Sequence, residues 1–162
     1  LRLRSSPAAH WVDIDLPHVI AQRERLLGRL FQRRPELLPQ RASLRSLSAN
    51  LSVAEEVRTT LRNALSDSAR GGTAIIVCEA LLIYLKPEDA AALLRIVRDE
   101  AMSAGLQSAT LCFADRLPNS PGFGMDEAKA ALHAAGFELD ESTWLPKPGL
   151  AKHMGVAHWA RS

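Results

Sequence analysis

The sequence predicts an α/β fold with a mostly parallel sheet that ends in an antiparallel pair of strands. Short β-branched, apolar runs alternate with longer segments of helical periodicity, which favours a parallel sheet with helices on both faces. The last two apolar runs have no helix between them, which indicates a terminal hairpin. The 162 residues are 47% hydrophobic and 23% charged, a composition typical of globular chains that bury one core. We therefore expect a single domain over residues 1–162.

The central stretch of this pattern is Thr73–Leu85, which reads TAIIVCEALLIYL. Thr73–Cys78 is a short apolar run after a glycine pair, and we expect it to form a buried strand. Glu79 then stands at the carboxyl end of that strand, where open α/β sheets bind ligands. A carboxylate between two apolar runs costs stability unless it has a partner or a function. Two interpretations stay open: Glu79 caps a nearby helix, or it faces a ligand.

The residues before this stretch predict two strand–helix units. His10–Asp15 alternates apolar and polar residues as a strand does, and a helix opens at Leu16-Pro17 with Asp15 near its N-cap. Pro35 and Pro39 end that helix.

The second unit begins with a weaker strand over Ala42–Ala49. Ser52 and Glu55 have the spacing of a capping box, and the helix that they open runs to about Leu65. Gly71-Gly72 then turns the chain into the central strand.

The residues after the central strand complete the alternation. Pro87–Ala104 has acids in its first turn and Gly105 behind its end, so it is the clearest helix of the sequence. The other expected elements are a strand over Ser108–Ala114 ending at Asp115, a helix over Met125–Ala135 ended by Gly136, and an antiparallel pair formed by Phe137–Thr143 and Met154–Ala160.

Composition and spacing argue against several classes of function. The net charge is +2, and the basic residues of Arg23–Arg34 alternate with leucines as on a solvated helix face, so we expect no nucleic-acid partner. No apolar run approaches the roughly 20 residues that span a bilayer, and no secretory signal is visible. The histidines lack metal-ligand spacing, and no serine lies in a G-x-S-x-G elbow.

Cys78 and Cys112 lie in predicted strands, so reduced, buried thiols are expected, with a disulfide between neighbouring strands as the alternative. These observations favour a reducing compartment, the cytoplasm or an organelle matrix.

The segment CEALLIYLKPEDAAALLRIV resembles the region around the fourth strand of the leucine carboxyl methyltransferase family, class I enzymes that use S-adenosylmethionine (SAM). Glu79, Tyr84, Leu85, Pro87 and Glu88 match the family pattern. The resemblance implies that Glu79 receives the α-ammonium group of SAM and that Tyr84 lines the pocket near the methyl acceptor. The alternative for Tyr84 is a core position with a satisfied hydroxyl.

The segment VDIDLPHVIAQR resembles the second-strand motif of the same family, with Asp13, Asp15, Pro17 and Arg23 at its motif positions. An acid at a strand end beside a nucleotide pocket can accept both ribose hydroxyls. The resemblance implies Asp15 as the first candidate for the SAM ribose and Asp13 as the second. From spacing alone, the favoured interpretation is that Asp15 caps the helix that follows, and the resemblance reverses this preference.

Asn50 and Leu51 align with a family segment that usually reads Ala-Asp-Leu, in which the acid receives the adenine amino group and the next N–H contacts the ring. Asparagine can accept from that amine through its side-chain oxygen but brings no charge. A turn-forming asparagine at a strand end is the alternative.

The family also carries a first strand and a glycine-rich loop of pattern Gly-x-Gly-x-Asp-Thr, which these residues do not contain. Arg2-Leu3 resembles the residues that follow the loop, so we expect a chain that is truncated at its N-terminus. In the family fold the absent strand lies between the second and fourth strands. A preceding segment, a partner chain or a rearranged sheet is then expected to fill that place.

The resemblance implies SAM as cofactor and methyl transfer to a hydroxyl or carboxyl oxygen. The section after Asp115 is compact and lacks a long helical insertion, so a small-molecule acceptor is expected. The alternative is a non-catalytic, methyltransferase-derived subunit of a larger assembly.

Overall fold

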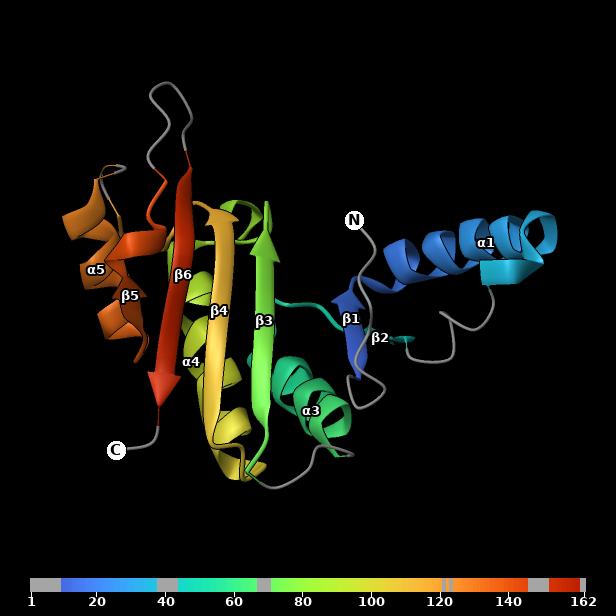
Figure 1. The fold of residues 1–162 in the computed structure, drawn as a ribbon, viewed down its shortest axis with the longest axis horizontal. Coiled ribbons are helices and arrows are strands. Elements are labelled where there is room, and N and C mark those ends of the chain that lie inside the picture. Colours follow the sequence, from blue (N-terminus) through green and yellow to red (C-terminus); the bar gives the residue numbers. More distant parts are fainter. Residues whose placement is uncertain are drawn as a thin grey trace. The chain divides into compact units, whose positions relative to one another are not determined.

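The computed structural model describes residues 10–37, 44–66, 71–120, 122, 124–145 and 152–160. The chain divides into two compact units, Leu1–Asn50 and Leu51–Ser162, which are described separately (Figure 1). The expectation of a single domain over residues 1–162 stays a prediction. None of the helices in the described part of the chain is long and apolar enough to cross a membrane.

The N-terminal unit is a parallel pair of strands with one long helix. Its elements are β1 (Trp11–Asp15), α1 (Pro17–Arg33), the 3-10 helix η1 (Pro35–Leu37) and β2 (Leu44–Ser48). The register places Trp11 opposite Leu44 and Asp15 opposite Ser48. Helix α1 has Pro17 in its first turn and ends before Pro35, as predicted, because proline fits the first turn but not a helix interior. Pro39 and residues 42–43 of the predicted second strand lie outside the described residues.

The C-terminal unit is a four-stranded sheet in the order β3-β4-β6-β5. Strand β3 pairs parallel with β4, whereas β6 pairs antiparallel with both β4 and β5. The elements are α3 (Ala54–Leu65), β3 (Thr73–Glu79), the 3-10 helix η2 (Leu82–Tyr84), α4 (Pro87–Ser103), β4 (Ser108–Asp115), α5 (Met125–Ala134), β5 (Glu138–Asp140), the 3-10 helix η3 (Glu141–Thr143) and β6 (His153–Ala160).

The observed pairing confirms the α/β class and the terminal antiparallel pair but corrects the mostly parallel sheet. The described strands form two sheets, and parallel and antiparallel pairs are equally represented among them. Strand β5 is shorter than the predicted Phe137–Thr143. The chain leaves the strand at Asp140, whose carboxylate accepts the Ser142 N–H at 3.0 Å and so starts η3.

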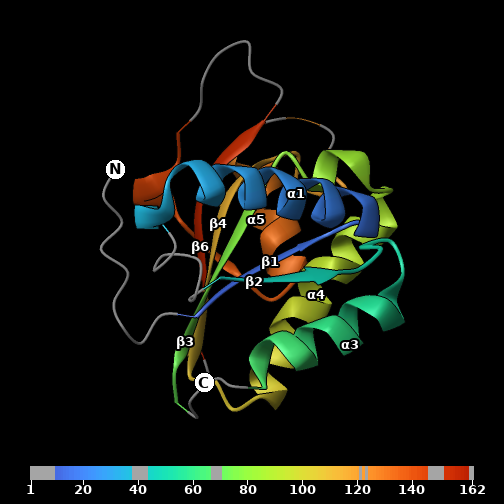
Figure 2. The ribbon, with the colours of Figure 1, turned by 90° about the vertical axis from the view of Figure 1, so that its right-hand side faces the viewer.

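One face of the four-stranded sheet carries the core. Alternate residues of β4 are buried, and helices α3, α4 and α5 cover this face, behind the sheet in Figure 1 and to its right in Figure 2. The buried side chains include Val57, Leu93, Leu94, Ala109, Leu111, Phe113, Leu132, Phe137, Ala157 and Trp159. In this continuous cluster, the strands and helices that alternate in the sequence bury their apolar sides against one another.

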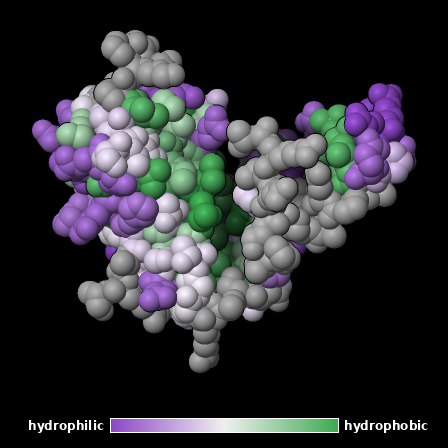
Figure 3. Space-filling model, viewed as in Figure 1, coloured by the Kyte–Doolittle hydropathy of each residue, from purple (hydrophilic) through white to green (hydrophobic). Residues whose placement is uncertain are grey.

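The opposite face of the same sheet is open in the described residues, although helices were expected on both faces. Ile75 and Val77 of β3 are 72% and 63% exposed, and Figure 3 shows hydrophobic surface over this strand. In register with them lie Thr110 and Cys112 of β4. The prediction of a buried strand over Thr73–Cys78 is therefore wrong for every second residue, because Thr73, Ile75 and Val77 are exposed. Cys78 is buried, and Ala74 and Ile76 are partly buried.

The predicted helix ends are largely confirmed. Gly105 and Gly136 follow α4 and α5 with φ of 84° and 80°, left-handed values that favour glycine. The predicted capping box is wrong, because α3 begins after Val53 and has no side-chain cap. Helix α3 is tied to α4 instead by Arg62 Nε, which donates to Glu100 Oε2 at 3.0 Å.

Candidate functional site

The predicted ligand-binding residues of the N-terminal unit lie at one end of its sheet. Asp15 is the last residue of β1, and Asn50 follows the end of β2 by two residues. Because β1 and β2 are parallel and Asp15 pairs with Ser48, both residues stand at the carboxyl ends of the strands. The Ala49 N–H donates to the Asp15 carbonyl at 3.0 Å, which fixes the start of the turn that carries Asn50. The structure thus brings Asp15 and Asn50 to one edge, whereas Asp13 lies in the middle of β1.

Asp13 already has a partner within this unit. Its carboxylate forms an ion pair with Arg23 of α1, and the two side chains are about half exposed or less. A second contact joins the same helix to the sheet, because the Ser46 hydroxyl donates to Glu24 at 2.8 Å. The basic residue of the predicted motif therefore balances the charge of Asp13.

Asp15 keeps more of its carboxylate available. Its Oδ1 accepts the backbone N–H of Leu16 at 2.7 Å. Leu16 is itself the N-cap of α1, so the Asp15 side chain does not bond the helix N–H groups that an N-cap residue satisfies. The capping interpretation of Asp15 is corrected accordingly.

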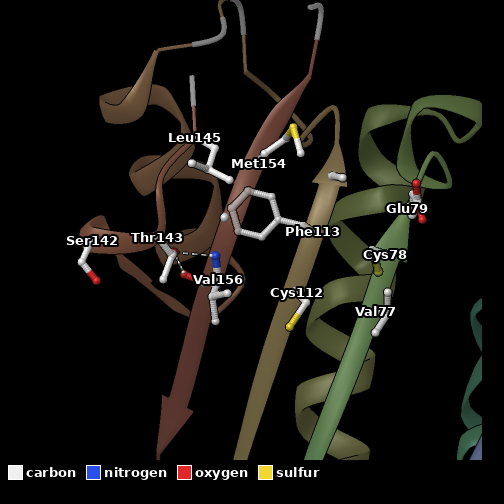
Figure 4. A pocket seen from close by; sticks show the side chains of 12 residues that line it. Val77, Cys78, Glu79, Cys112, Phe113, Ser142, Thr143, Leu145, Met154 and Val156 are labelled. Atoms are coloured by element: carbon white, nitrogen blue, oxygen red, sulfur yellow. Dashed lines mark hydrogen bonds between the residues drawn. The ribbon is translucent and has the colours of Figure 1, made fainter. Parts of the chain in front are cut away.

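In the C-terminal unit, Glu79 ends β3 with an exposed side chain, visible at the tip of that strand in Figure 4. The helices that follow it, η2 and α4, have N-caps at Leu81 and Lys86 and no side-chain cap bond. The capping interpretation of Glu79 is therefore wrong for the helices that the structure describes. Among the described residues, no donor bonds the Glu79 carboxylate.

Tyr84 lies at the end of η2 with 82% of its surface exposed. The interpretation of this tyrosine as a core residue is wrong, because such exposure leaves its ring outside the packed interior. Leu51, by contrast, packs its side chain partly against the core of the C-terminal unit. The structure does not test the ligand roles of these residues, and they stay predictions.

The segment between Glu79 and Tyr84 is held by a residue that the sequence indicated only as a strand end. Asp115, at the end of β4, is 1% exposed and accepts the N–H groups of Leu81, Leu82 and Ile83. The signal that could have revealed it is its position, because two neighbouring parallel strands both end in an acid. Glu79 and Asp115 occupy these ends, with Glu79 in register with Ala114.

A shallow hollow of about 490 Å³ lies beside Glu79 on the open face of the sheet (Figure 4). Side chains of three strands and of the segment around η3 line it, among them Val77, Cys112, Val156, Thr143 and Leu145. The hollow is mostly apolar, and its polar side chains are Glu79, Ser142 and Thr143. Such a surface can accommodate an apolar group but offers few polar groups to orient one.

Both cysteines are free thiols. Burial, assisted by the negative charge of Asp115, raises the pKa of Cys78 to about 12, so its thiol is inert at neutral pH. Within the part of the chain that the structure describes, no group of three or more His, Cys, Asp or Glu side chains is placed to hold a metal ion.

A buried serine–histidine contact was not predicted. Nε2 of His153 lies 3.3 Å from the Ser120 hydroxyl, and its Nδ1 accepts the Leu117 N–H at 3.1 Å. In a neutral ring with Nδ1 accepting, the proton resides on Nε2. This nitrogen therefore donates to Ser120 and cannot take its proton, so the pair lacks the arrangement that activates a serine nucleophile.

The family model for leucine carboxyl methyltransferase matches residues 1–98 of the 162. The chain belongs to the leucine carboxyl methyltransferase family. The match includes Asp13, Asp15, Asn50, Leu51, Glu79 and Tyr84, and the resemblance seen in the sequence is confirmed. No curated protein matches the chain.

One solved structure supports the fold of this member of the leucine carboxyl methyltransferase family. A candidate O-methyltransferase of Nostoc punctiforme PCC 73102 is similar with a TM-score of 0.51 and 12% identity, over 94% of this chain and 45% of that one. The chain therefore spans about 45% of the length of that structure. At such identity the likeness concerns the α/β fold alone.

Two further structures are more distant. Magnesium protoporphyrin IX methyltransferase of Synechocystis PCC 6803, solved with bound SAH, has a TM-score of 0.42 and 15% identity, over 86% of this chain and 61% of that one. LepI, solved in complex with SAM, has a TM-score of 0.45 and 8% identity, over 99% of this chain and 45% of that one.

Proposed function

We propose that this chain is part of a SAM-dependent O-methyltransferase that transfers a methyl group to a hydroxyl or carboxyl oxygen of a small molecule. The observation that carries the proposal is the pair of acids at strand ends, Asp15 in β1 and Glu79 in β3. The Asp15 carboxylate accepts the Leu16 N–H through one oxygen, and no described donor bonds Glu79. Membership of the leucine carboxyl methyltransferase family supports SAM as the ligand that these acids serve.

The chemistry of these residues fits the polar groups of SAM. A carboxylate can accept two neighbouring ribose hydroxyls, and Asp15 is the first candidate for this role. Asp13 is the second candidate, although its ion pair with Arg23 occupies it in part. The Glu79 carboxylate is suited to the α-ammonium group, the Asn50 side-chain oxygen to the adenine amine, and the Leu51 N–H to the adenine ring.

When bound, SAM would supply a methyl group on a positively charged sulfur, and an oxygen nucleophile would accept this methyl group as S-adenosylhomocysteine leaves. The contribution of the protein is then to bind and orient the two reactants, with no covalent step of its own. We assign Asp15 to the ribose of SAM and Glu79 to its α-ammonium group. Tyr84, an exposed residue five positions beyond Glu79, is proposed to orient the acceptor oxygen.

One feature supports a small acceptor. After Asp115 the described chain has only the short helix α5 and the β5–β6 pair, without a long helical insertion that could bind a protein substrate. Methyl transfer by the protein to peptides that mimic a phosphatase C-terminus would contradict this part of the proposal.

A second candidate is a non-catalytic subunit derived from a methyltransferase. The observation that favours it is the exposure of Ile75 and Val77 on the open face, together with the position of β3 at one edge of its sheet. A partner that covers this face would bury apolar surface and complete the backbone pairing of β3. A stable complex that forms without SAM binding would favour this function over the enzyme.

The deciding experiment is calorimetric titration of the protein with SAM and with S-adenosylhomocysteine. We expect micromolar binding that Asp15→Ala abolishes. The control is Asp99→Ala, because among the described residues Asp99 pairs only with the neighbouring Arg98 on the surface of α4. Equal binding by both variants, or no binding by a protein shown to be folded, would contradict the assignment of Asp15.

A further inference from the structure

Asp115 is a buried carboxylate that binds several backbone N–H groups at once. Its Oδ2 accepts from Leu81 at 2.5 Å and from Leu82 at 2.6 Å, while its Oδ1 accepts from Ile83 at 3.0 Å. Oδ1 also accepts from the N–H of Arg116 at 2.8 Å. Three successive N–H groups thus point to one side chain, which lies 32 to 34 residues further along the chain.

This geometry depends on an unusual backbone just after β3. Ala80 has a φ of 49°, a left-handed value that residues with a Cβ adopt rarely. Its N–H donates to the Ala114 carbonyl at 3.2 Å, which continues the pairing of β3 with β4 by one residue. The chain then turns back over the end of β4, and a run of N–H groups forms a concave site that suits an anion. The Asp115 carboxylate occupies this site.

The held segment has one side in the core and one side in solvent. Leu82 is 2% exposed, whereas Ile83 and Tyr84 are 45% and 82% exposed. The segment joins Glu79 directly to Tyr84, so the conformation that Asp115 imposes determines where both side chains are presented. A loop without this anchor would lose that constraint, because the hydrogen bonds of η2 alone close only one turn.

We propose that Asp115 is a positioning residue of the SAM site, which fixes the Glu79–Tyr84 segment so that Glu79 can receive the ammonium group of the cofactor. The inference rests on the proposed function. Asp115 itself is buried beneath the segment and acts through it. The two acids at neighbouring strand ends thus have different roles: Glu79 binds the ligand, and Asp115 binds the backbone.

The test compares Asp115→Asn with Asp140→Asn. Asp140 is a matched control, because its carboxylate also accepts an N–H at the start of a 3-10 helix, that of Ser142, but it does not bond the backbone of residues 81–83. Asparagine keeps one acceptor oxygen and turns the other into a donor, which opposes the N–H groups it faces. We expect amide hydrogen exchange of Leu81–Ile83 to rise roughly 10- to 100-fold in Asp115→Asn only.

The binding measurement separates positioning from a general loss of structure. S-adenosylhomocysteine and 5′-methylthioadenosine share the nucleoside, but only the first carries the ammonium group. We expect Asp115→Asn to weaken the first ligand at least about tenfold and to leave the second within about twofold, as Glu79→Gln should. Equal weakening of both ligands would overturn the positioning role.

Tyr84 provides an independent readout because it is the only tyrosine of the chain. With 3-fluorotyrosine incorporated, the protein gives one fluorine resonance, which should shift on adding S-adenosylhomocysteine in the wild type and in Asp140→Asn but not in Asp115→Asn. A shift of the same size in all three proteins would contradict the proposal.

The wild-type protein alone also tests the anchor, should Asp115→Asn fail to fold. The N–H groups of Leu81, Leu82 and Ile83 should exchange at least about 100-fold more slowly than that of Glu88, which lies in the first turn of α4. Rapid exchange at these three positions would overturn the inference. Slow exchange in a protein that binds neither ligand would instead contradict the proposed function while leaving the anchor supported.

Discussion

Arg23 of α1 forms an ion pair with Asp13 of β1, and this contact distinguishes two acids that the sequence places in one motif. The charge of Asp13 is balanced by a residue of the helix that packs on the same sheet. Asp15, two residues on, accepts one N–H at the strand end. The ion pair therefore indicates that Asp13 stabilises the N-terminal unit, and it favours Asp15 as the residue that binds the cofactor.

This difference predicts unequal effects on SAM binding. Asp15→Asn should weaken SAM roughly 10- to 100-fold, the cost of losing hydrogen bonds to a charged acceptor. Asp13→Asn should change it by less than about threefold, because the Arg23 pair is a surface contact. Calorimetry on the two isosteric variants measures both, and an equal loss would show that Asp13 also binds the ribose.

The burial of the Glu100 side chain leads us to predict an effect on the free energy of unfolding. Glu100 is 4% exposed and accepts from Arg58 and Arg62, so Glu100→Gln should lower the free energy of unfolding by about 1–3 kcal/mol. Asp99→Asn, one residue earlier, removes only a surface pair and should cost less than about 1 kcal/mol. Chemical denaturation of both variants tests the difference, and equal midpoints would contradict it.

The His153 contacts predict a dependence of stability on pH. Burial lowers the pKa of His153 below its ordinary value of 6.5, so the unfolded chain binds a proton more readily than the folded one. Stability is therefore fully present above about pH 6.5 and is lost as the pH falls below it, by at most about 1.4 kcal/mol per pH unit for this group.

Thermal unfolding between pH 7.5 and 5.5 measures that loss. His153→Asn keeps an acceptor for the Leu117 N–H and does not titrate, so its melting temperature should fall less steeply over this range. The same slope in both proteins would assign the acid sensitivity to other groups.

The two thiols should differ in reactivity. With a pKa of about 12, only about 1 in 10,000 Cys78 thiols is ionised at pH 8, and the side chain is 6% exposed. Cys112 lies half-buried on the open face of the sheet. Ellman's reagent should therefore release one equivalent quickly from the native protein and two in denaturant. Cys112→Ser should abolish the fast phase, and two fast equivalents from the native protein would contradict the burial of Cys78.

Local signals predicted much of this fold. The position of β3 follows from its β-branched run after two glycines, and the ends of α4 and α5 follow from Gly105 and Gly136. The pairing of Phe137–Thr143 with Met154–Ala160 was also predicted, because two apolar runs without an intervening helix have few other partners. These features depend on neighbours in the chain.

The errors concern interactions that no local pattern contains. An unbroken apolar run cannot reveal which of its faces is covered, so the exposure of Ile75 was not predicted. The capping box at Ser52 failed because the helix starts one residue later than its spacing implies. Asp115 looked like a simple strand end, since its partners at residues 81–83 become visible only when β3 and β4 are placed side by side.

The distance along the chain between Asp115 and its partners has a consequence for the order of folding. While the protein is being synthesised, residues 80–84 leave the ribosome before the carboxylate that binds them, and helix α4 and strand β4 must follow first. The turn after β3 therefore cannot adopt its final conformation until β4 has docked beside β3. Its left-handed Ala80 and its N–H groups depend on the acceptor oxygens of Asp115, which neighbouring residues do not supply. Closure of the β3–α4–β4 crossover is thus the event that gives Glu79 and Tyr84 their final positions.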